Sequence, residues 1–198
     1  MSYKKKIALI FGISGQDGIY LSKLLIDKNY IVIGTSRVKR NNISNFKKVG
    51  ITKAIKIHKI NPQNENEVKK IIKLTHCNEI YYFSGISSVS YSFKHPEETL
   101  IANTKGIINI LESCRIINKK IKIYNAATGE CFGSSKKLID ENSPFLPNSP
   151  YALSKTVNSY IVKNYRDNLG MWVVNGFSFN HDSPLRPKNY ILKKISDY

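Results

Sequence analysis

The sequence contains no apolar run long enough to cross a membrane, because no segment approaches about 18 uninterrupted apolar residues. The basic and then apolar start, Met1–Phe11, resembles a secretory signal. Its apolar part is short and leads straight into a glycine-rich loop, so we interpret it as a first strand. Cysteines are also few: there are three, widely spaced. Their odd number and spacing fit neither a disulfide framework nor a metal site, so we expect no bound metal and a reducing cytoplasm.

Acidic residues are scarce as well. The chain of 198 residues carries 14 Asp and Glu against 31 Lys and Arg, a formal net charge of +17. Such an excess suits a nucleic-acid partner or the attraction of an anionic cofactor and substrate. It also follows from a heavy general use of lysine that leaves a solvated basic surface. Because the lysines are scattered and no basic stripe alternates with aromatic residues, we predict no nucleic-acid partner.

Short apolar runs alternate with segments of helical periodicity, and this alternation predicts the fold. Runs rich in Ile, Val, Tyr and Phe predict strands, namely Ile7–Phe11, Tyr30–Ser36, Ala54–His58, Glu79–Phe83, Ile121–Ala126 and Met171–Phe177. Apolar residues three and four apart predict helices over Asp17–Asp27, Glu65–Thr75, Pro96–Ile117 and Pro150–Asn168. Strand–helix alternation implies right-handed crossovers and a parallel sheet covered on both faces. We therefore predict an α/β fold with a doubly wound parallel sheet of the Rossmann type.

The first predicted strand ends in a glycine-rich loop with the spacing Gly12-x-x-Gly15-x-x-Gly18. Glycine there lets the backbone turn tightly and approach a pyrophosphate that sits on the N-terminus of the following helix. The spacing differs from the commoner Gly-x-Gly-x-x-Gly and resembles that of the short-chain dehydrogenase/reductase superfamily. We predict a cofactor site formed by this loop, with the residues Gly12, Ser14, Gly15, Gln16, Asp17 and Gly18.

The end of the second predicted strand lacks the carboxylate that usually holds the adenosine ribose of NAD. The stretch Ile33–Arg40 contains basic residues instead, of which Arg37 comes first. Because a planar guanidinium can bind a 2′-phosphate through two hydrogen bonds, we predict NADP rather than NAD as the cofactor; a solvated basic turn is the alternative. Asn61 stands where an aspartate often meets the adenine, and we expect its amide to make that contact.

Tyr151 and Lys155 lie four residues apart in a predicted helix and therefore share one face. The ammonium can favour the phenolate and lower the pKa of Tyr151 from about 10 toward working pH. Such a phenol can take a proton from a sugar hydroxyl while hydride leaves the same carbon. The spacing alone also describes an ordinary exposed helix pair. Together with the glycine loop and Thr128-x-Glu130 at a predicted strand end, it predicts a catalytic site.

Longer stretches resemble one family, the GDP-mannose 4,6-dehydratases, which are extended short-chain dehydrogenase/reductases. The resemblance covers essentially the whole chain, and its matching stretches include Phe11–Gly18, Tyr124–Gly133, Pro144–Lys155 and Phe179–Arg186. The combination of Gly-Gln-Asp-Gly with Asn-His-Asp-Ser-Pro is more specific than any Rossmann pattern. The resemblance implies conversion of GDP-mannose to GDP-4-keto-6-deoxymannose with bound NADP. It also implies assembly as a dimer or tetramer.

The resemblance implies a role for each residue of the predicted catalytic site. Tyr151 would remove the O4 proton as C4 gives up hydride, while Lys155 lowers the pKa of that tyrosine and holds the nicotinamide ribose. Thr128 would hydrogen-bond O4. Glu130 would remove the C5 proton and help to expel the C6 hydroxyl as water, after which hydride returns to C6. Two alternatives stay open: Thr128 as a residue that satisfies the strand end, and Glu130 as a surface carboxylate.

The resemblance also suggests residues around the substrate. Asn180 would contact the diphosphate or the sugar, with a loop cap as the alternative, and Arg186 and Lys194 would pair with the diphosphate. Asn103 resembles the helix asparagine that supports the active site in the superfamily, with helix packing as the alternative. We expect His181 to hold its loop rather than to titrate in catalysis.

The chain departs from the family in two motifs and in length. Gly129 stands where the family usually has serine, which removes a hydroxyl and loosens the backbone, and Ser84–Ser88 differs from the family pattern. Because family members are much longer, we divide the chain into an NADP-binding Rossmann domain with the catalytic residues (1–178) and the start of an otherwise missing substrate-binding region (179–198). One functional alternative is another NADP-dependent nucleotide-sugar epimerase, dehydratase or reductase, against which Glu130 argues. The other is a truncated, non-catalytic NADP-binding module.

Overall fold

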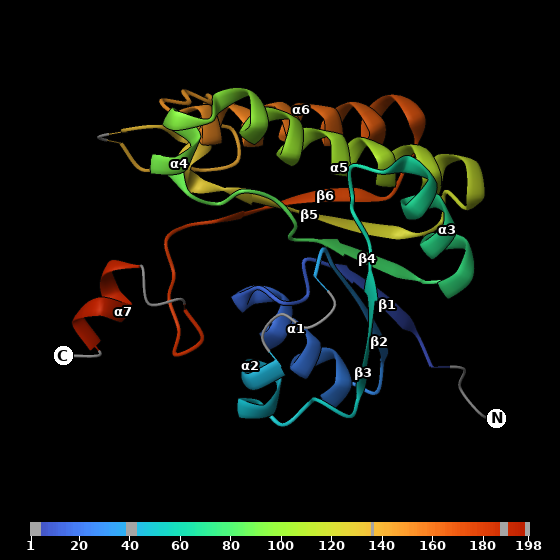
Figure 1. Cartoon of the computed structure of the whole chain (residues 1–198). Coiled ribbons are helices and arrows are strands. Elements are labelled where there is room, and N and C mark those ends of the chain that lie inside the picture. The colour runs from blue at the N-terminus through green and yellow to red at the C-terminus, as the bar shows by residue number, and fades with distance from the viewer. Residues whose placement is uncertain (1–4, 39–42, 136, 187–189, 197–198) are drawn as a thin grey trace.

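The computed structural model describes residues 5–38, 43–135, 137–186 and 190–196. Its centre is a six-stranded parallel sheet in the order β3-β2-β1-β4-β5-β6 (Figure 1). The strands are β1 (Ile7–Phe11), β2 (Ile31–Ser36), β3 (Ile55–Lys59), β4 (Glu79–Tyr82), β5 (Lys122–Thr128) and β6 (Val173–Ser178). The helices are α1 (Gln16–Asp27), α2 (Ile43–Lys48), α3 (Glu65–Thr75), α4 (Val89–Lys94), α5 (Pro96–Ile117), the 3-10 helix η1 (Gly129–Phe132), α6 (Pro150–Leu169) and α7 (Ile191–Ser196).

Helices cover both faces of the sheet (Figure 1). On one face α3, α5 and α6 contribute Ile72, Ile110 and Val162 to a core that they share with the inward side chains of the strands. On the other face α1 and α2 contribute Ile19 and Phe46 to a second core. This two-sided burial explains why the strand sequences are almost continuously apolar. The doubly wound α/β fold predicted from the sequence is therefore confirmed.

The predicted strands and long helices agree with the structure to within two residues at each end. The short helices α2, α4 and η1 are absent from the prediction. They contain six, six and four residues. A segment of that length completes too few turns for an apolar period to show, so its helical state depends on what surrounds it.

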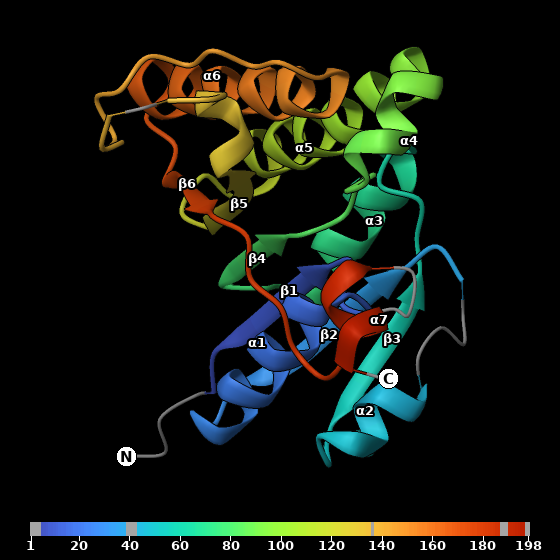
Figure 2. The same cartoon turned by 90° about the vertical axis from the view of Figure 1, so that its left-hand side faces the viewer.

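The order of the strands creates a crevice between β1 and β4. β2 and β3 follow β1 on one side of the sheet, whereas β5 and β6 follow β4 on the other. The chain therefore leaves the carboxyl ends of β1 and β4 in opposite directions, and Figure 2 views the molecule from that edge. Doubly wound folds bind their ligands at this switch point.

Helix α6 has a well-defined start and end. At its start the Ser149 hydroxyl oxygen accepts a hydrogen bond from the Ala152 amide at 3.0 Å, and Pro150 occupies the first turn. Both features are typical of a helix N-terminus. At the other end Gly170 adopts the left-handed conformation, with φ of 64°. The cap holds the first turn of α6, which carries Tyr151.

The segment after β6 returns along the sheet edge toward α1 (Figures 1 and 2). Leu185 is buried in the same core cluster as Ile10 and Ile19. The Ser183 hydroxyl donates a hydrogen bond to Gln16 Oε1 at 2.7 Å. This segment therefore packs on the Rossmann domain up to residue 186. The assignment of residues 179–198 as the start of a substrate-binding region stays a prediction.

Two features are missing from the described part of the chain. No helix there is both long and apolar enough to span a membrane. No group of histidine, cysteine or acidic side chains there could hold a metal ion. The cysteines Cys77, Cys114 and Cys131 are free and buried.

Candidate active site

The loop between β1 and α1 requires glycine for two different reasons. Gly12 has φ of +80°, and a Cβ there would lie 2.8 Å from the Ser84 nitrogen. A Cβ on Gly18 would lie 2.7 Å from the Ile13 Cα, so both positions exclude any larger residue. At Gly15, by contrast, a Cβ would meet nothing closer than 3.4 Å. Packing does not require glycine there, but its small size leaves room for a ligand against the backbone.

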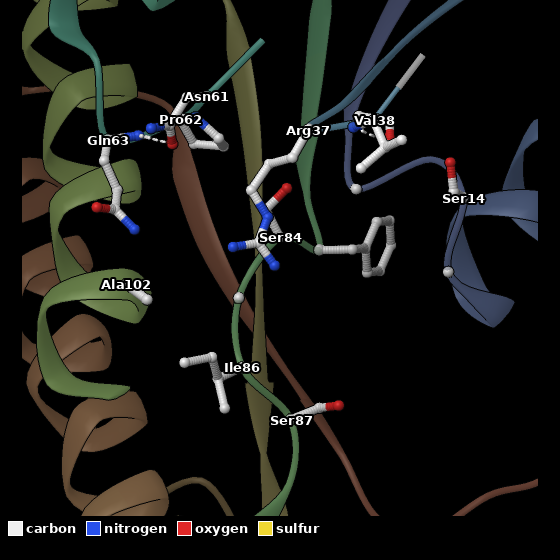
Figure 3. Close-up of a pocket in the computed structure, with 15 residues that line it drawn as sticks. Ser14, Arg37, Val38, Asn61, Pro62, Gln63, Ser84, Ile86, Ser87 and Ala102 are labelled. Atoms are coloured by element: carbon white, nitrogen blue, oxygen red, sulfur yellow. Dashed lines mark hydrogen bonds between the residues drawn. The ribbon is translucent and has the colours of Figure 1, made fainter. Parts of the chain in front are cut away.

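A cavity of about 530 Å³ opens beside this loop (Figure 3). Ser14 lies on one side of it, Asn61 and Gln63 lie on the other, and Arg37 extends between them. Gly15 is the cap residue of α1 and has no side chain to cover the first amides of the helix. Those amides and the positive end of the helix dipole suit a diphosphate. The walls of the cavity therefore fit a dinucleotide.

Two sets of residues that line this cavity follow β2 and β3. Arg37 comes directly after β2, whereas the neighbouring bases Lys39 and Arg40 lie outside the described residues. The Asn61 side-chain oxygen accepts a hydrogen bond from the Gln63 amide at 3.1 Å, which leaves the side-chain nitrogen to donate to a ligand. Gln63 also lines the cavity. No motif in the sequence marked it, because only the turn after β3 brings it there.

A second cavity of about 190 Å³ adjoins the first, and the two share wall residues from the loop after β4. Its lining includes all four residues of the predicted catalytic site and two of the predicted substrate residues: Thr128, Glu130, Tyr151, Lys155, Asn180 and Arg186. A third hollow of about 570 Å³ continues from it past Arg186 to Tyr190. Lys194 lines none of these three cavities and is exposed on α7.

Lys155 lies deeper than the helix spacing suggested. Its ammonium donates a hydrogen bond to the Ala126 carbonyl at 2.9 Å, and burial lowers the pKa of Lys155 to about 8. Burial also raises the pKa of Tyr151, although a hydrogen bond with Thr128 opposes the shift. The ammonium binds the backbone of β5, and partial burial of the phenol disfavours its charged form. That Lys155 lowers the pKa of Tyr151 stays a prediction.

The Thr128-x-Glu130 motif turns directly from β5 into η1. The Thr128 hydroxyl oxygen accepts a hydrogen bond from the Glu130 amide at 3.3 Å, so it caps the turn as well as contacting Tyr151. A Cβ on Gly129 would lie 2.6 Å from the Phe179 ring. The ring thus covers the glycine, and the looser backbone expected at Gly129 stays a prediction. Glycine at this position allows Phe179 to approach the site.

Asn103 supports the wall between the first two cavities. Its side chain is fully buried on α5 and accepts a hydrogen bond from the Ile86 amide at 2.7 Å. It also donates to the Ile86 carbonyl at 3.2 Å and to the Ser154 hydroxyl at 2.8 Å. Asn103 therefore ties the loop after β4 to the helix that carries Lys155. Packing and support, the two roles considered from the sequence, are fulfilled together.

Gln16 and Asp17, predicted to bind the cofactor, do not line the first cavity, although Asp17 lines the second. Besides the bond between Gln16 and Ser183, Asp17 Oδ1 lies 2.8 Å from the His181 Nε2. The two most specific motifs of the sequence thus contact each other across the site. Gly18 packs against Ile13, which leaves Gly12, Ser14 and Gly15 as the loop residues that line the first cavity.

The fold and the site together define a class of protein. A doubly wound sheet with a glycine-rich loop at its switch point and a Tyr-x-x-x-Lys helix before its last strand is an extended short-chain dehydrogenase/reductase. A more specific similarity covers nearly the whole chain, because residues 9–198 match the family described as GDP-mannose 4,6 dehydratase. The chain belongs to this family.

Curated relatives agree with that assignment. A GDP-mannose 4,6-dehydratase from Sinorhizobium fredii is 36% identical over 203 residues, which cover 97% of this chain and 57% of the relative. GDP-mannose 4,6 dehydratase 1 of Arabidopsis thaliana is 34% identical over 97% of this chain and 56% of its own length. The chain therefore spans about half the length of the curated relatives it matches.

Solved structures share the fold at lower sequence identity. A dTDP-glucose 4,6-dehydratase from Streptomyces venezuelae, solved with NAD, superposes with a TM-score of 0.85 at 21% identity. The match covers 96% of this chain and 61% of that one. A UDP-glucose 4-epimerase from Brucella ovis gives a TM-score of 0.79 at 18% identity, over 88% of this chain and 52% of that one.

Proposed function

We propose that this protein is a GDP-mannose 4,6-dehydratase that uses NADP and converts GDP-mannose to GDP-4-keto-6-deoxymannose with loss of water. One observation carries the proposal: the groups needed for oxidation and for elimination line a single cavity that adjoins a dinucleotide-sized one. Thr128, Glu130 and Tyr151 come from β5, η1 and α6, so only the fold brings them together. The family match supports the choice of sugar nucleotide.

The first cavity has the groups that NADP needs. Gly12, Gly15 and the first amides of α1 would hold the diphosphate, and Arg37 would hold the 2′-phosphate. Asn61 would meet the adenine, and Tyr151 and Lys155 would hold the nicotinamide ribose. When bound, the nicotinamide accepts and returns hydride. The lack of a carboxylate at the end of β2 favours NADP over NAD.

The side chains of the second cavity divide the proton transfers between them. Tyr151 takes the proton from O4 while C4 is oxidised, and Thr128 orients that oxygen. The resulting C4 ketone makes the C5 proton acidic. Glu130 removes that proton and passes it to the C6 hydroxyl, which leaves as water while the electrons of the C–H bond form a C5–C6 double bond. The returned hydride would add to C6, and C5 would take up the proton that Tyr151 holds. An enzyme that only epimerises or reduces at C4 does not need this carboxylate.

Two variants separate the two halves of the proposed reaction. Tyr151→Phe removes the base for oxidation, so we expect neither reduced nicotinamide absorbance nor water loss after GDP-mannose is added to the NADP-bound protein. Glu130→Gln keeps the base for oxidation, so we expect the absorbance to rise while water is retained. Unchanged product formation in Glu130→Gln would contradict the role of Glu130. Product formation in Tyr151→Phe would contradict the site as a whole.

Assembly and location complete the proposal. Apolar side chains exposed on the outer faces of α5 and α6 support a homo-oligomer, dimer or tetramer, in which these faces are covered: Leu100, Ile101, Leu153 and Tyr160. Sedimentation equilibrium would test it, and a monomer at all concentrations would contradict it. The free, buried cysteines support a reducing, cytoplasmic location.

A further inference from the structure

His181 lies between two hydrogen-bond acceptors. Its Nδ1 is 2.8 Å from the Phe179 carbonyl oxygen, and its Nε2 is 2.8 Å from Asp17 Oδ1. A neutral imidazole has only one N–H and could donate to only one of them, whereas an imidazolium donates to both. The geometry therefore selects the charged form of His181. In that form the ring connects the segment after β6 to the first turn of α1.

The surroundings of His181 agree with this charge state. The Phe179 carbonyl and then Asp17 raise the pKa of His181 above its ordinary value of 6.5, whereas burial and the nearby Arg186 oppose the shift. Glu130 from η1 and Lys155 from α6 line the same cavity, with opposite charges. Asp182 forms an ion pair with Arg186 at 3.5 Å. The two hydrogen-bond acceptors thus raise the pKa of His181 more than burial and Arg186 lower it.

A second contact supports the first. The Ser183 hydroxyl donates a hydrogen bond to Gln16 Oε1, just as His181 pairs with Asp17. Two consecutive residues at the start of α1 therefore hold two residues of the segment after β6. Figure 2 shows this segment running from β6 past α1 to α7. The same segment carries Asn180 and Arg186 into the second cavity. What fastens it to α1 therefore also sets the positions of those two side chains.

We propose that Gln16 and Asp17 are positioning residues for the sugar-nucleotide side of the site. They hold the segment 179–186 through Ser183 and the His181 imidazolium. Deprotonation of His181 loosens this segment. The identity of the substrate rests on the proposed function, whereas the attachment is a property of the fold. Because the folded-state pKa of His181 is raised, the attachment is complete below about pH 6.5 and is lost as the pH rises through the raised value.

Amide hydrogen exchange, corrected for the intrinsic pH dependence, tests the attachment in the ligand-free chain. In His181→Ala we expect peptides from residues 179–186 to exchange about tenfold faster at about pH 6, as for loss of a partly exposed charged hydrogen bond. The wild type should approach the rate of the variant as the pH rises. The exchange rate of peptides from α1 should be the same in His181→Ala and in the wild type. This comparison separates a local effect from partial unfolding.

His95→Ala is the matched control. The side chain of His95 is 48% exposed, as is that of His181, and it lies 4.0 Å from Glu98 at the start of α5. We expect exchange of residues 179–186 in this control to equal that of the wild type. The same exchange rates in wild type and His181→Ala, or a wild-type rate that does not depend on pH, would overturn the attachment.

Calorimetric titration tests the positioning. His181→Ala and Ser183→Ala should bind NADP as the wild type does, and should bind GDP-mannose about tenfold more weakly when NADP is saturating. Faster exchange with unchanged GDP-mannose affinity would overturn the positioning role. If the wild type binds NADP but no GDP-mannose, the proposed substrate is wrong, and the exchange experiment alone then decides the attachment.

Discussion

Replacing Lys155 with methionine should make the ligand-free protein more stable. Lys155 is only 7% exposed, and burial lowers its pKa from 10.5 to about 8. A drop of about 2.5 in pKa corresponds to about 3 kcal/mol of free energy lost by keeping the charge inside. Methionine fills the space without a charge, but it leaves the Ala126 carbonyl without its donor, at a cost of about 1 kcal/mol. The net gain is about 2 kcal/mol, or roughly 4–8 °C in Tm for a chain of this size.

The pH dependence of the free energy of unfolding provides a second test of the same prediction. Below about pH 8 both the folded and the unfolded states bind the proton of Lys155, and the charge destabilises the folded state in full. Between about pH 8 and pH 10.5 only the unfolded state still binds it, so the stability of the wild type rises with pH. Lys155→Met lacks this rise. Buried groups with raised pKa, such as Cys114 and Tyr82, act in the opposite direction but equally in both proteins.

Urea unfolding between about pH 7 and pH 10 measures both effects. Lys163→Met is the matched control, since Lys163 lies on the same helix with its side chain 62% exposed and pairs with Asp167. We expect the control to change the free energy of unfolding by less than about 0.5 kcal/mol. A Lys155→Met variant that is less stable than the wild type at pH 7, or that shows the same rise with pH, would refute the reasoning. The stabilised variant should bind NADP poorly, because Lys155 lines the site.

Three further substitutions test the cavity walls. Arg37→Gln should weaken NADP binding by about ten- to a hundredfold and NAD binding by less than about twofold, measured by calorimetry, because only NADP has the 2′-phosphate; an equal loss for both would contradict its role. Asn103→Ala should lower the free energy of unfolding by about 2–4 kcal/mol, since it removes three hydrogen bonds made by a fully buried side chain. A loss below about 1 kcal/mol in urea unfolding would contradict its role in tying the loop to α6. Gly12→Ala should destabilise the fold by at least about 2 kcal/mol more than Gly50→Ala. Gly50 has nearly the same φ (+76° against +80°) but nothing within 4 Å of a new Cβ, so equal losses would contradict the close approach of Gly12 to Ser84.

The sequence predicts the sheet and the glycine loop well because their signals are local. Apolar runs with β-branched residues define strands in a parallel sheet, and the order of strands and helices then restricts the topology. Gly12 and Gly18 are needed by the backbone itself, so the motif and the structure coincide there. The predicted catalytic residues line one cavity because Thr128 ends β5, Glu130 follows it in η1, and Tyr151 and Lys155 lie near the start of α6. Of these elements, β5 and α6 were predicted.

The sequence could not predict how deeply a side chain is buried or toward which segment it points. Helical spacing places Tyr151 and Lys155 on one face, but it does not reveal that the Lys155 ammonium donates to the Ala126 carbonyl. In the same way Gln16 and Asp17 belong to a cofactor motif, yet their side chains turn toward a segment more than 160 positions away in the chain. Contacts of this kind are set by how elements pack, and no period or spacing encodes them.

The most direct test of the proposed activity is the mass of the product. The purified chain would be incubated with GDP-mannose and a catalytic amount of NADP, and the sugar nucleotide would be examined by mass spectrometry. We predict a product lighter by one water, which is absent when Tyr151→Phe replaces the wild type. Unchanged GDP-mannose, in a wild-type protein shown to bind both NADP and GDP-mannose, would contradict the proposal that the residues of this cavity carry out the dehydration.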